Sequence, residues 1–95
     1  MTKKTVPFNA RGIGKLPDDK PVVYKIYSEG GRNNYTGVAK RGRVEDRLRE
    51  HLPGGKNPIP GVKVQIERMS SIGDAEAKEA RIIARSKPPH NEQGK

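Results

Sequence analysis

Residues 22–37 of the chain read VVYKIYSEGGRNNYTG and contain its strongest pattern for β structure. Branched and aromatic side chains cluster in the first six positions, where Val22, Tyr24 and Ile26 would share one face of a strand. The polar segment that follows is rich in glycine and asparagine and is typical of a turn, so a second strand is expected to begin at Tyr35. The pattern predicts a β-hairpin that places Tyr24 and Tyr35 on neighbouring strands.

Two helices and one further strand are expected after the hairpin. Apolar side chains at every fourth position predict a helix over residues 43–52, with a buried stripe formed by Val44, Leu48 and Leu52. Alternating apolar and polar residues over 62–66 predict a strand whose buried face is formed by Val62, Val64 and Ile66. A second helix is expected over residues 74–85, because two prolines follow it closely. The predicted fold class is mixed α/β of the α+β type, a small three-stranded antiparallel sheet flanked by helices.

The first 20 residues differ in character from the rest of the chain. They combine basic residues, prolines and the sequence Gly12-Ile13-Gly14 without a sustained helix or strand period. We therefore expect residues 1–20 to form a flexible or loosely docked basic arm, and residues 21–95 to form the folded domain. A length of 95 residues suits one small domain.

The overall charge indicates an acidic partner. The chain has 20 Lys and Arg residues against 11 Asp and Glu, which gives a formal net charge of +9 at pH 7 and favours nucleic acid as the partner. Because cysteine is absent, disulfides and thiolate metal sites are excluded, and a cytoplasmic location is expected. No apolar stretch is long enough to cross a bilayer, so no membrane partner is expected.

A carboxylate lies on the apolar face predicted for the last helix. Glu79 is three and four positions before Ile82 and Ile83, so it shares their face. Because an unpaired buried charge is costly, Glu79 should be protonated, paired with a base such as Arg47, or bound to a cation. Glu76 is nearly in phase with the same face. Periodicity alone leaves open the choice between the two glutamates and the choice between a salt bridge and a metal site.

The first helix carries Arg47 and His51 four positions apart, beside its apolar stripe. A guanidinium can hold two phosphate oxygens and a histidine can exchange a proton near neutral pH, so the pair suits a phosphate. The alternative is a solvated helix face with a histidine that the helix dipole favours at its end. Lys40, Arg41 and Arg43 follow the second strand, where they form either contacts to a nucleic-acid backbone or an ordinary solvated surface.

Inward tyrosines such as Tyr24 and Tyr35 are most simply core residues when each is taken singly. Together with the groups on the two helices, they resemble the GIY-YIG nuclease family over residues 21–91. Val22-Val23-Tyr24 stands where that family has Gly-Ile-Tyr, and Tyr35-Thr36-Gly37 stands where it has Tyr-Ile-Gly, with the tyrosines eleven positions apart. Val22 and Thr36 depart from the family pattern, but neither replaces a catalytic group.

The residues after the hairpin complete the resemblance. Arg47 and His51 match the family's motif of Arg, three residues and His. Glu79, rather than Glu76, matches its single catalytic glutamate, and Asn91, twelve positions after Glu79, matches its closing Pro-x-x-Asn. Many relatives append a DNA-recognition domain, which we do not expect within these 95 residues. Site specificity is therefore expected to come from loops, the arm, a protein partner or a dimer.

The resemblance implies a metal-dependent endonuclease that hydrolyses phosphodiester bonds of DNA, or of RNA. Its catalytic residues would be Tyr24, Tyr35, Arg47, His51, Glu79 and Asn91. Glu79 would hold one Mg²⁺ or Mn²⁺ and Arg47 the scissile phosphate. Tyr24 would be the general base, its phenol made more acidic by the cationic surroundings, with Tyr35 or His51 assisting. The nucleic-acid backbone would bind, without sequence readout, to Lys40, Arg41 and Arg43.

Two other functions fit the same composition. A non-catalytic basic module that binds DNA or RNA, such as a ribosome-associated protein, accounts equally well for the net charge. A degenerate GIY-YIG relative that binds nucleic acid without cutting it accounts for the motifs as well. Metal-dependent cleavage distinguishes the nuclease from both.

Overall fold

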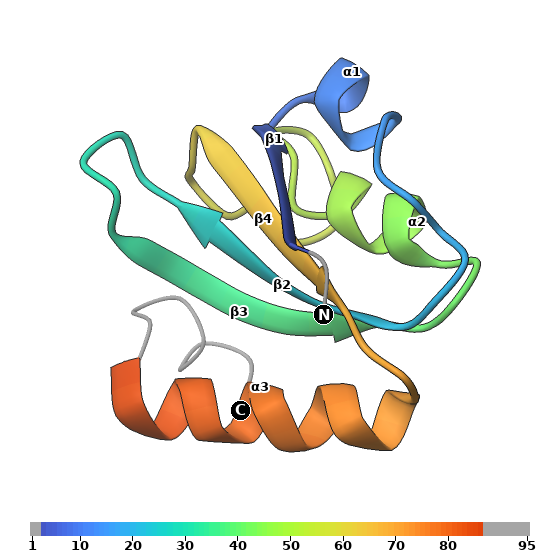
Figure 1. The fold of residues 1–95 in the computed structure, drawn as a ribbon. Coiled ribbons are helices and arrows are strands. Elements are labelled where there is room, and N and C mark those ends of the chain that lie inside the picture. Colours follow the sequence, from blue (N-terminus) through green and yellow to red (C-terminus); the bar gives the residue numbers. More distant parts are fainter. Residues whose placement is uncertain (1–2, 87–95) are drawn as a thin grey trace.

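Four strands and three helices make up the part of the chain that the structure describes. The structure is a computed structural model and describes residues 3–86 (Figure 1). In chain order the elements are β1 (Lys3–Pro7), α1 (Ala10–Ile13), β2 (Val22–Tyr27), β3 (Asn33–Ala39), α2 (Val44–Arg49), β4 (Lys63–Arg68) and α3 (Ile72–Ser86). The two helices expected from the sequence are α2 and α3. Within residues 3–86, no helix is long and apolar enough to span a membrane.

A single antiparallel sheet with the strand order β1-β4-β2-β3 forms the middle of the fold. β2 and β3 form the expected hairpin, in which Tyr24 pairs with Gly37 and Ile26 pairs with Tyr35. Tyr24 and Tyr35 therefore lie on neighbouring strands, as the sequence predicts, and the register offsets them diagonally. The prediction of three strands is wrong, because β1 adds a fourth strand beside β4.

The sequence predicts a flexible or loosely docked basic arm over residues 1–20. In the described part of this range the structure has a strand, β1, and a short helix, α1. β1 pairs with β4 along its whole length, and Phe8 and Ile13 enter the core. Periodicity does not reveal this strand, because Val6 is the only one of its five residues that is buried. Pro7 is compatible with a strand at the edge of a sheet, where the missing N–H needs no partner. These residues belong to the domain.

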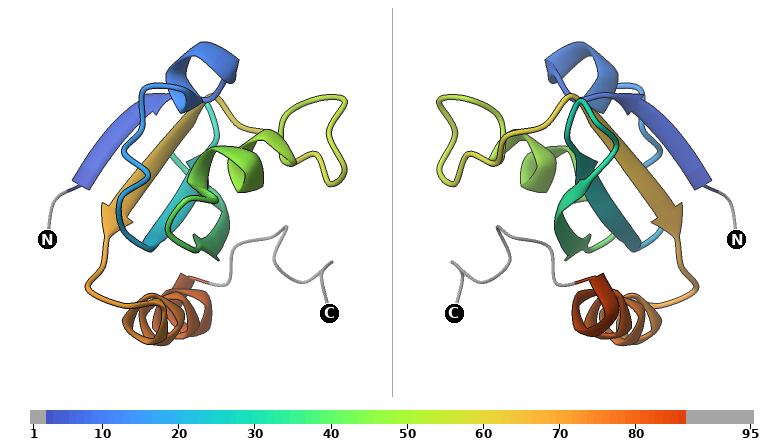
Figure 2. Two further views of the ribbon diagram at one scale, coloured as in Figure 1. Left: turned by 90° about the vertical axis from the view of Figure 1, so that its right-hand side faces the viewer. Right: turned by 90° about the vertical axis from the view of Figure 1, so that its left-hand side faces the viewer.

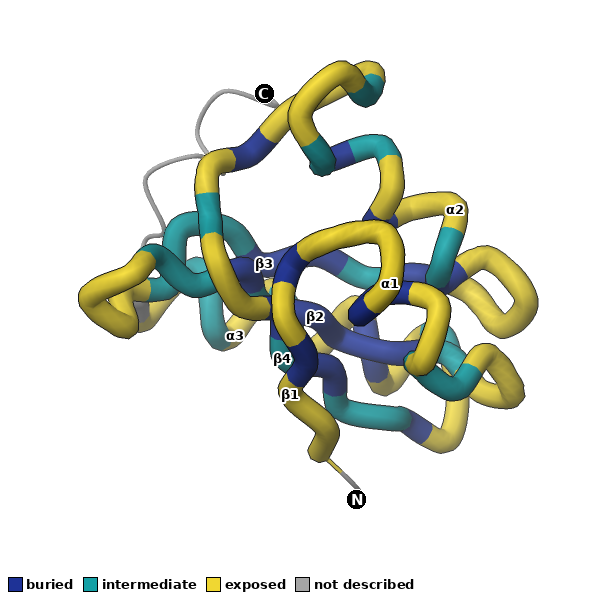
Figure 3. The backbone as a smooth tube through the Cα atoms, turned by 90° about the horizontal axis from the view of Figure 1, so that it is seen from above, coloured by how far each residue is buried: buried dark blue, intermediate teal, exposed yellow. Residues whose placement is uncertain are grey.

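Helices cover both faces of the sheet. α1 and α2 lie on one side and α3 lies on the other, as the side views show (Figure 2). The larger core forms on the α1 and α2 side and includes Tyr24, Val44 and Leu48, whereas a smaller core joins Val23 of β2 to α3. Because successive residues of a strand point to opposite faces, β2 contributes to both cores and is buried along most of its length (Figure 3).

The start of β4 differs from the prediction. Val64 and Ile66 are buried in the larger core, as expected, but Val62 is 46% exposed and precedes the strand. The backbone of Val62 donates to the carbonyl of Tyr27 and accepts from the N–H of Phe8. This residue is therefore held by main-chain hydrogen bonds rather than by burial of its side chain.

Candidate active site

Tyr24 is completely buried on the α2 face of β2, with its ring against the backbone of β3. A Cβ atom added at Gly37 would lie 2.6 Å from both the Cζ and the hydroxyl oxygen of Tyr24, and 3.0 Å from Cε2 of Tyr35. Real Cβ atoms do not approach so closely. The glycine of the Tyr35-Thr36-Gly37 sequence is thus required because it leaves room for the Tyr24 hydroxyl.

The Gly37→Ala substitution is expected to destabilise the protein by about 1–3 kcal/mol, because the buried Tyr24 ring cannot move aside without disturbing the core. Urea unfolding of the variant measures this change. Gly30→Ala is the matched control, since a Cβ at Gly30 meets nothing within 4 Å. Equal free energies of unfolding for the two variants would contradict the assigned packing of Tyr24 on Gly37.

His51 lies just after α2 and fixes the direction of a hydrogen-bond chain. Its Nε2 is 2.9 Å from the Tyr24 hydroxyl, and its Nδ1 is 2.9 Å from the carbonyl oxygen of Asn57. Because a carbonyl oxygen only accepts, Nδ1 carries the proton and Nε2 is left to accept from Tyr24. Burial lowers the pKa of His51 below its usual 6.5, although the bond to Asn57 opposes this in part. The ring is therefore neutral at pH 7 and can accept a proton from Tyr24.

Stability is expected to fall as the pH decreases from 6.5 toward the lower pKa of folded His51. In this window the unfolded chain binds a proton that the folded chain does not, with a limiting slope of about 1.4 kcal/mol per pH unit. Above pH 6.5 both states are neutral at this residue and the effect is absent.

Urea unfolding between about pH 5 and 7.5 tests this expectation on the wild type and His51→Gln. The difference in slope between the two proteins isolates His51 from Glu79, whose raised pKa gives stability the opposite pH dependence. Identical slopes would contradict a neutral, buried His51.

Tyr35 completes a cluster of three rings. Its centroid lies 4.8 Å from that of His51 and 6.1 Å from that of Tyr24, with which it is stacked. Burial raises the pKa of both phenols, and the Arg47 charge lowers each of them only in part. The expectation of a more acidic Tyr24 phenol is therefore wrong. Tyr35 is only half-buried, so it is the phenol that solvent or substrate can reach.

Arg47 lines a cavity of about 310 Å³ between α2, α3 and the end of β3. The cavity walls are formed by Val38, Ala39, Lys40, Arg43, Arg47, Ile72 and Glu76. The Asp18 carboxylate, 3.0 Å from the backbone N–H of Val44, accepts a hydrogen bond at the start of α2 and so anchors the helix. Among the described residues, Arg47 makes no ion pair within 4.0 Å. Its guanidinium acts on the Tyr24 phenol, whose pKa it lowers in part, and it has no carboxylate partner within residues 3–86 that would compete with an anion in the cavity.

Glu79 of α3 is half-buried beside these groups. Burial raises its pKa, Glu76 raises it further, and Arg47 lowers it in part. The charge of Glu79 in turn raises the pKa of Tyr24 and Tyr35, so this carboxylate lies within electrostatic range of both phenols. Within residues 3–86 no ion pair of Glu79 is found within 4.0 Å, which does not favour the salt-bridge interpretation.

Five of the predicted catalytic residues lie together at this site. They come from β2, β3, α2, the turn that follows α2, and α3. They are Tyr24, Tyr35, Arg47, His51 and Glu79. Lys40 and Arg43 line the Arg47 cavity, whereas Arg41 is exposed and does not line it. Asn91 lies outside the described residues. In the described part of the chain no group of three or more His, Asp or Glu side chains could hold a metal ion.

Sequence reasoning missed two groups that position the site. The Asn57 carbonyl fixes the tautomer of His51, and the Asp18 carboxylate caps α2 from 26 positions away. A main-chain carbonyl leaves no signal in a sequence, and a capping residue distant in the chain escapes local motifs. The resemblance to the GIY-YIG family favours Glu79 over Glu76, yet Glu76 lines the cavity with Arg47.

The fold is similar to that of the GIY-YIG N-terminal endonuclease domain of UvrC from Thermotoga maritima, a structure bound to its catalytic divalent cation, magnesium. The match has a TM-score of 0.64 at 24% sequence identity, and it covers 85% of this chain and 93% of that chain. No protein-family model and no curated protein matches the sequence. The mixed α/β fold, with its four-stranded antiparallel sheet, is therefore that of a GIY-YIG domain.

Proposed function

We propose that this protein is a metal-dependent endonuclease that hydrolyses phosphodiester bonds of DNA. The observation that carries the proposal is that one carboxylate, one guanidinium and the hydrogen-bonded Tyr24–His51 pair converge near β3, within electrostatic range of one another. Core packing alone does not require a charged residue such as Glu79 on this face. A protein that only binds nucleic acid does not require a carboxylate among its lysine and arginine side chains. The fold shared with a magnesium-bound endonuclease domain supports the same conclusion.

Glu79 is the residue that would hold the metal ion. Its carboxylate is half-buried, its pKa is raised by burial and by Glu76, and a cation would relieve both effects. Mg²⁺ binds through one or two carboxylates and keeps several waters, so it suits a site with so few protein ligands. The carboxylate of Glu79 therefore fits Mg²⁺ or Mn²⁺. When bound, the ion would stabilise negative charge on the leaving oxygen.

Arg47 would bind the scissile phosphate. Its guanidinium lines the cavity and lacks a carboxylate partner within residues 3–86. A guanidinium can donate two parallel hydrogen bonds to phosphate oxygens and can offset the charge that grows on them during attack by water. Lys40 and Arg43, on the same cavity, would bind the flanking backbone together with Arg41.

The ring cluster would remove the proton from the attacking water. Tyr24 is inaccessible in the free protein, which favours Tyr35 as the group that meets the water. The ring of Tyr35 is stacked on that of Tyr24, with the centroids 6.1 Å apart, and Tyr24 donates to the neutral Nε2 of His51. Tyr35 would pass the proton of the water to Tyr24 as Tyr24 gives its own to His51, so neither phenol needs a low pKa in the resting protein.

Incubation of supercoiled plasmid with the purified protein tests the proposal. The plasmid should be nicked with Mg²⁺ and spared with EDTA, while DNA binding persists in both conditions. Nicking of one strand at a time is expected, because residues 3–86 form one such site. Binding without nicking at any concentration of Mg²⁺ or Mn²⁺ would contradict the nuclease and support a non-catalytic binding module.

A further inference from the structure

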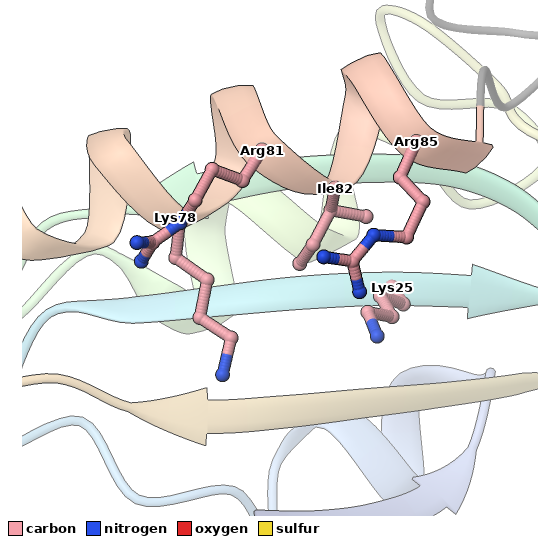
Figure 4. Close-up of a pocket in the computed structure, with 5 residues that line it drawn as sticks. All are labelled: Lys25, Lys78, Arg81, Ile82 and Arg85. Carbon is pink, nitrogen blue, oxygen red and sulfur yellow. The ribbon is translucent and has the colours of Figure 1, made fainter.

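A second cavity lies on the other flank of α3. It has a volume of about 330 Å³ and is lined by Lys25, Lys78, Arg81, Ile82 and Arg85. Figure 4 shows Lys78 and Arg85 extending from α3 toward the sheet, with Lys25 of β2 below Arg85 and Ile82 between them. Four of the five lining residues are cations, so we call this cavity the basic pocket.

The basic pocket is separate from the candidate active site. In an α-helix each residue is turned about 100° from the last, so Lys78, Arg81 and Arg85 share one flank of α3. Glu76 lies on the opposite flank, and Glu79 is turned by about 100° or more from each of the three cations. Lys25 likewise points to the face of the sheet opposite Tyr24, because the two are successive residues of β2. The proposed catalytic groups therefore do not account for these four cations.

The cations of the basic pocket are poorly compensated by acidic groups. Glu67 forms an ion pair with Lys78, but within residues 3–86 neither Lys25, Arg81 nor Arg85 has a carboxylate within 4.0 Å. Burial lowers the pKa of Lys25, the charges of Lys3 and Lys78 lower it further, and the charge of Glu67 opposes them in part. The pocket therefore concentrates positive charge around a hollow that an anion can enter.

We propose that the basic pocket binds a backbone phosphate of the nucleic acid, at a position remote from the scissile phosphate. Two guanidiniums supply directed pairs of hydrogen bonds and the Lys25 ammonium supplies further charge, a combination suited to a phosphodiester. Such a contact positions the nucleic acid without reading its sequence. The identity of the ligand rests on the proposed function, although binding at this pocket does not require cleavage.

DNA binding by an Arg81→Gln/Arg85→Gln variant tests the proposal. Both side chains are exposed, and neither has an ion-pair partner in the described part of the chain, so the variant should fold. Arg11→Gln/Lys15→Gln removes the same charge from the α1 region, on the far side of the sheet, and is the matched control. The affinity for a fluorescent duplex is measured in EDTA over a range of salt concentrations, with thermal unfolding as the check on folding.

The Arg81/Arg85 variant should bind the duplex about tenfold more weakly than the control, and its logarithmic salt dependence should be shallower by about one to two. Affinity and salt slope equal to those of the control would overturn the proposal. If the wild type binds in this manner but does not cut with Mg²⁺, the nuclease proposal fails and the basic pocket stands. If the wild type cuts with Mg²⁺ but the two variants bind alike, the nuclease proposal stands and the basic-pocket proposal fails.

Inorganic phosphate distinguishes a nucleic-acid phosphate from a small free anion. Titration of the wild type with inorganic phosphate should give only weak binding, and phosphate should compete with the duplex only at high concentration. Tight phosphate binding that depends on Arg81 and Arg85 and is unaffected by duplex would assign the pocket to a free anion and overturn the nucleic-acid assignment.

Discussion

Glu79→Gln is expected to lose metal-dependent DNA cleavage by at least about 10³-fold, because a bound ion contributes several kcal/mol to the transition state. The substitution preserves shape and removes the charge that would hold the ion. Folding should be unaffected or slightly improved, since burial and Glu76 already disfavour the charged form of Glu79. DNA binding in EDTA should remain, because the cations that bind the backbone are unchanged.

Glu76→Gln is the control for the choice between the two carboxylates. Both residues lie on α3, and Glu76 lines the cavity with Arg47. The charge of Glu79, however, is the one that raises the pKa of Tyr24 and of Tyr35. Glu76→Gln should therefore keep cleavage within about tenfold of the wild type. Cleavage that survives Glu79→Gln and disappears in Glu76→Gln would assign the metal to Glu76 instead.

Arg47→Ala is expected to reduce cleavage by about 10²–10³-fold, the usual effect of removing one preorganised donor to a developing oxyanion. DNA binding should weaken by only about threefold, since a single phosphate contact is lost from a protein with many cations. Cleavage is measured under single-turnover conditions and binding is measured in EDTA, so that the two effects are separated.

Arg49→Ala is the matched control for charge on α2. Arg49 is paired with Glu45 on the solvent side, so its loss removes the same charge without touching the cavity. It should affect cleavage and binding only slightly. If Arg47→Ala lost binding and cleavage in equal proportion, Arg47 would be a general tether to the backbone rather than a ligand of the scissile phosphate.

The hairpin and α2 could be predicted from the sequence because their signals are local. The placement of Tyr24 and Tyr35 on neighbouring strands follows from two strands and a turn that are continuous in the chain. The apolar stripe of Val44 and Leu48 likewise fixes the face of α2 beside which Arg47 lies. β1 could not be predicted, because four of its five residues are exposed and the strand is stabilised by pairing with β4, some 60 positions away. Non-local pairing of this kind leaves no period in the sequence.

The chemistry of the ring cluster was also beyond the sequence. The resemblance to the GIY-YIG family implies that Tyr24 and His51 share a site, but it does not show that Tyr24 is fully enclosed or that His51 is oriented by a main-chain carbonyl. Cationic surroundings predicted a more acidic phenol, whereas burial has the larger effect and raises the pKa of Tyr24. The balance between burial and charge depends on packing, which a sequence does not give.

Paramagnetic broadening by Mn²⁺ tests most directly whether Glu79 holds a divalent ion next to Arg47. Substoichiometric Mn²⁺ added to isotope-labelled protein should broaden the amide signals of α3 around Glu79 and of the facing end of α2, and excess Mg²⁺ should reverse the effect. The same titration of Glu79→Gln should leave these signals sharp. Broadening centred elsewhere, or persisting unchanged in Glu79→Gln, would contradict the metal site.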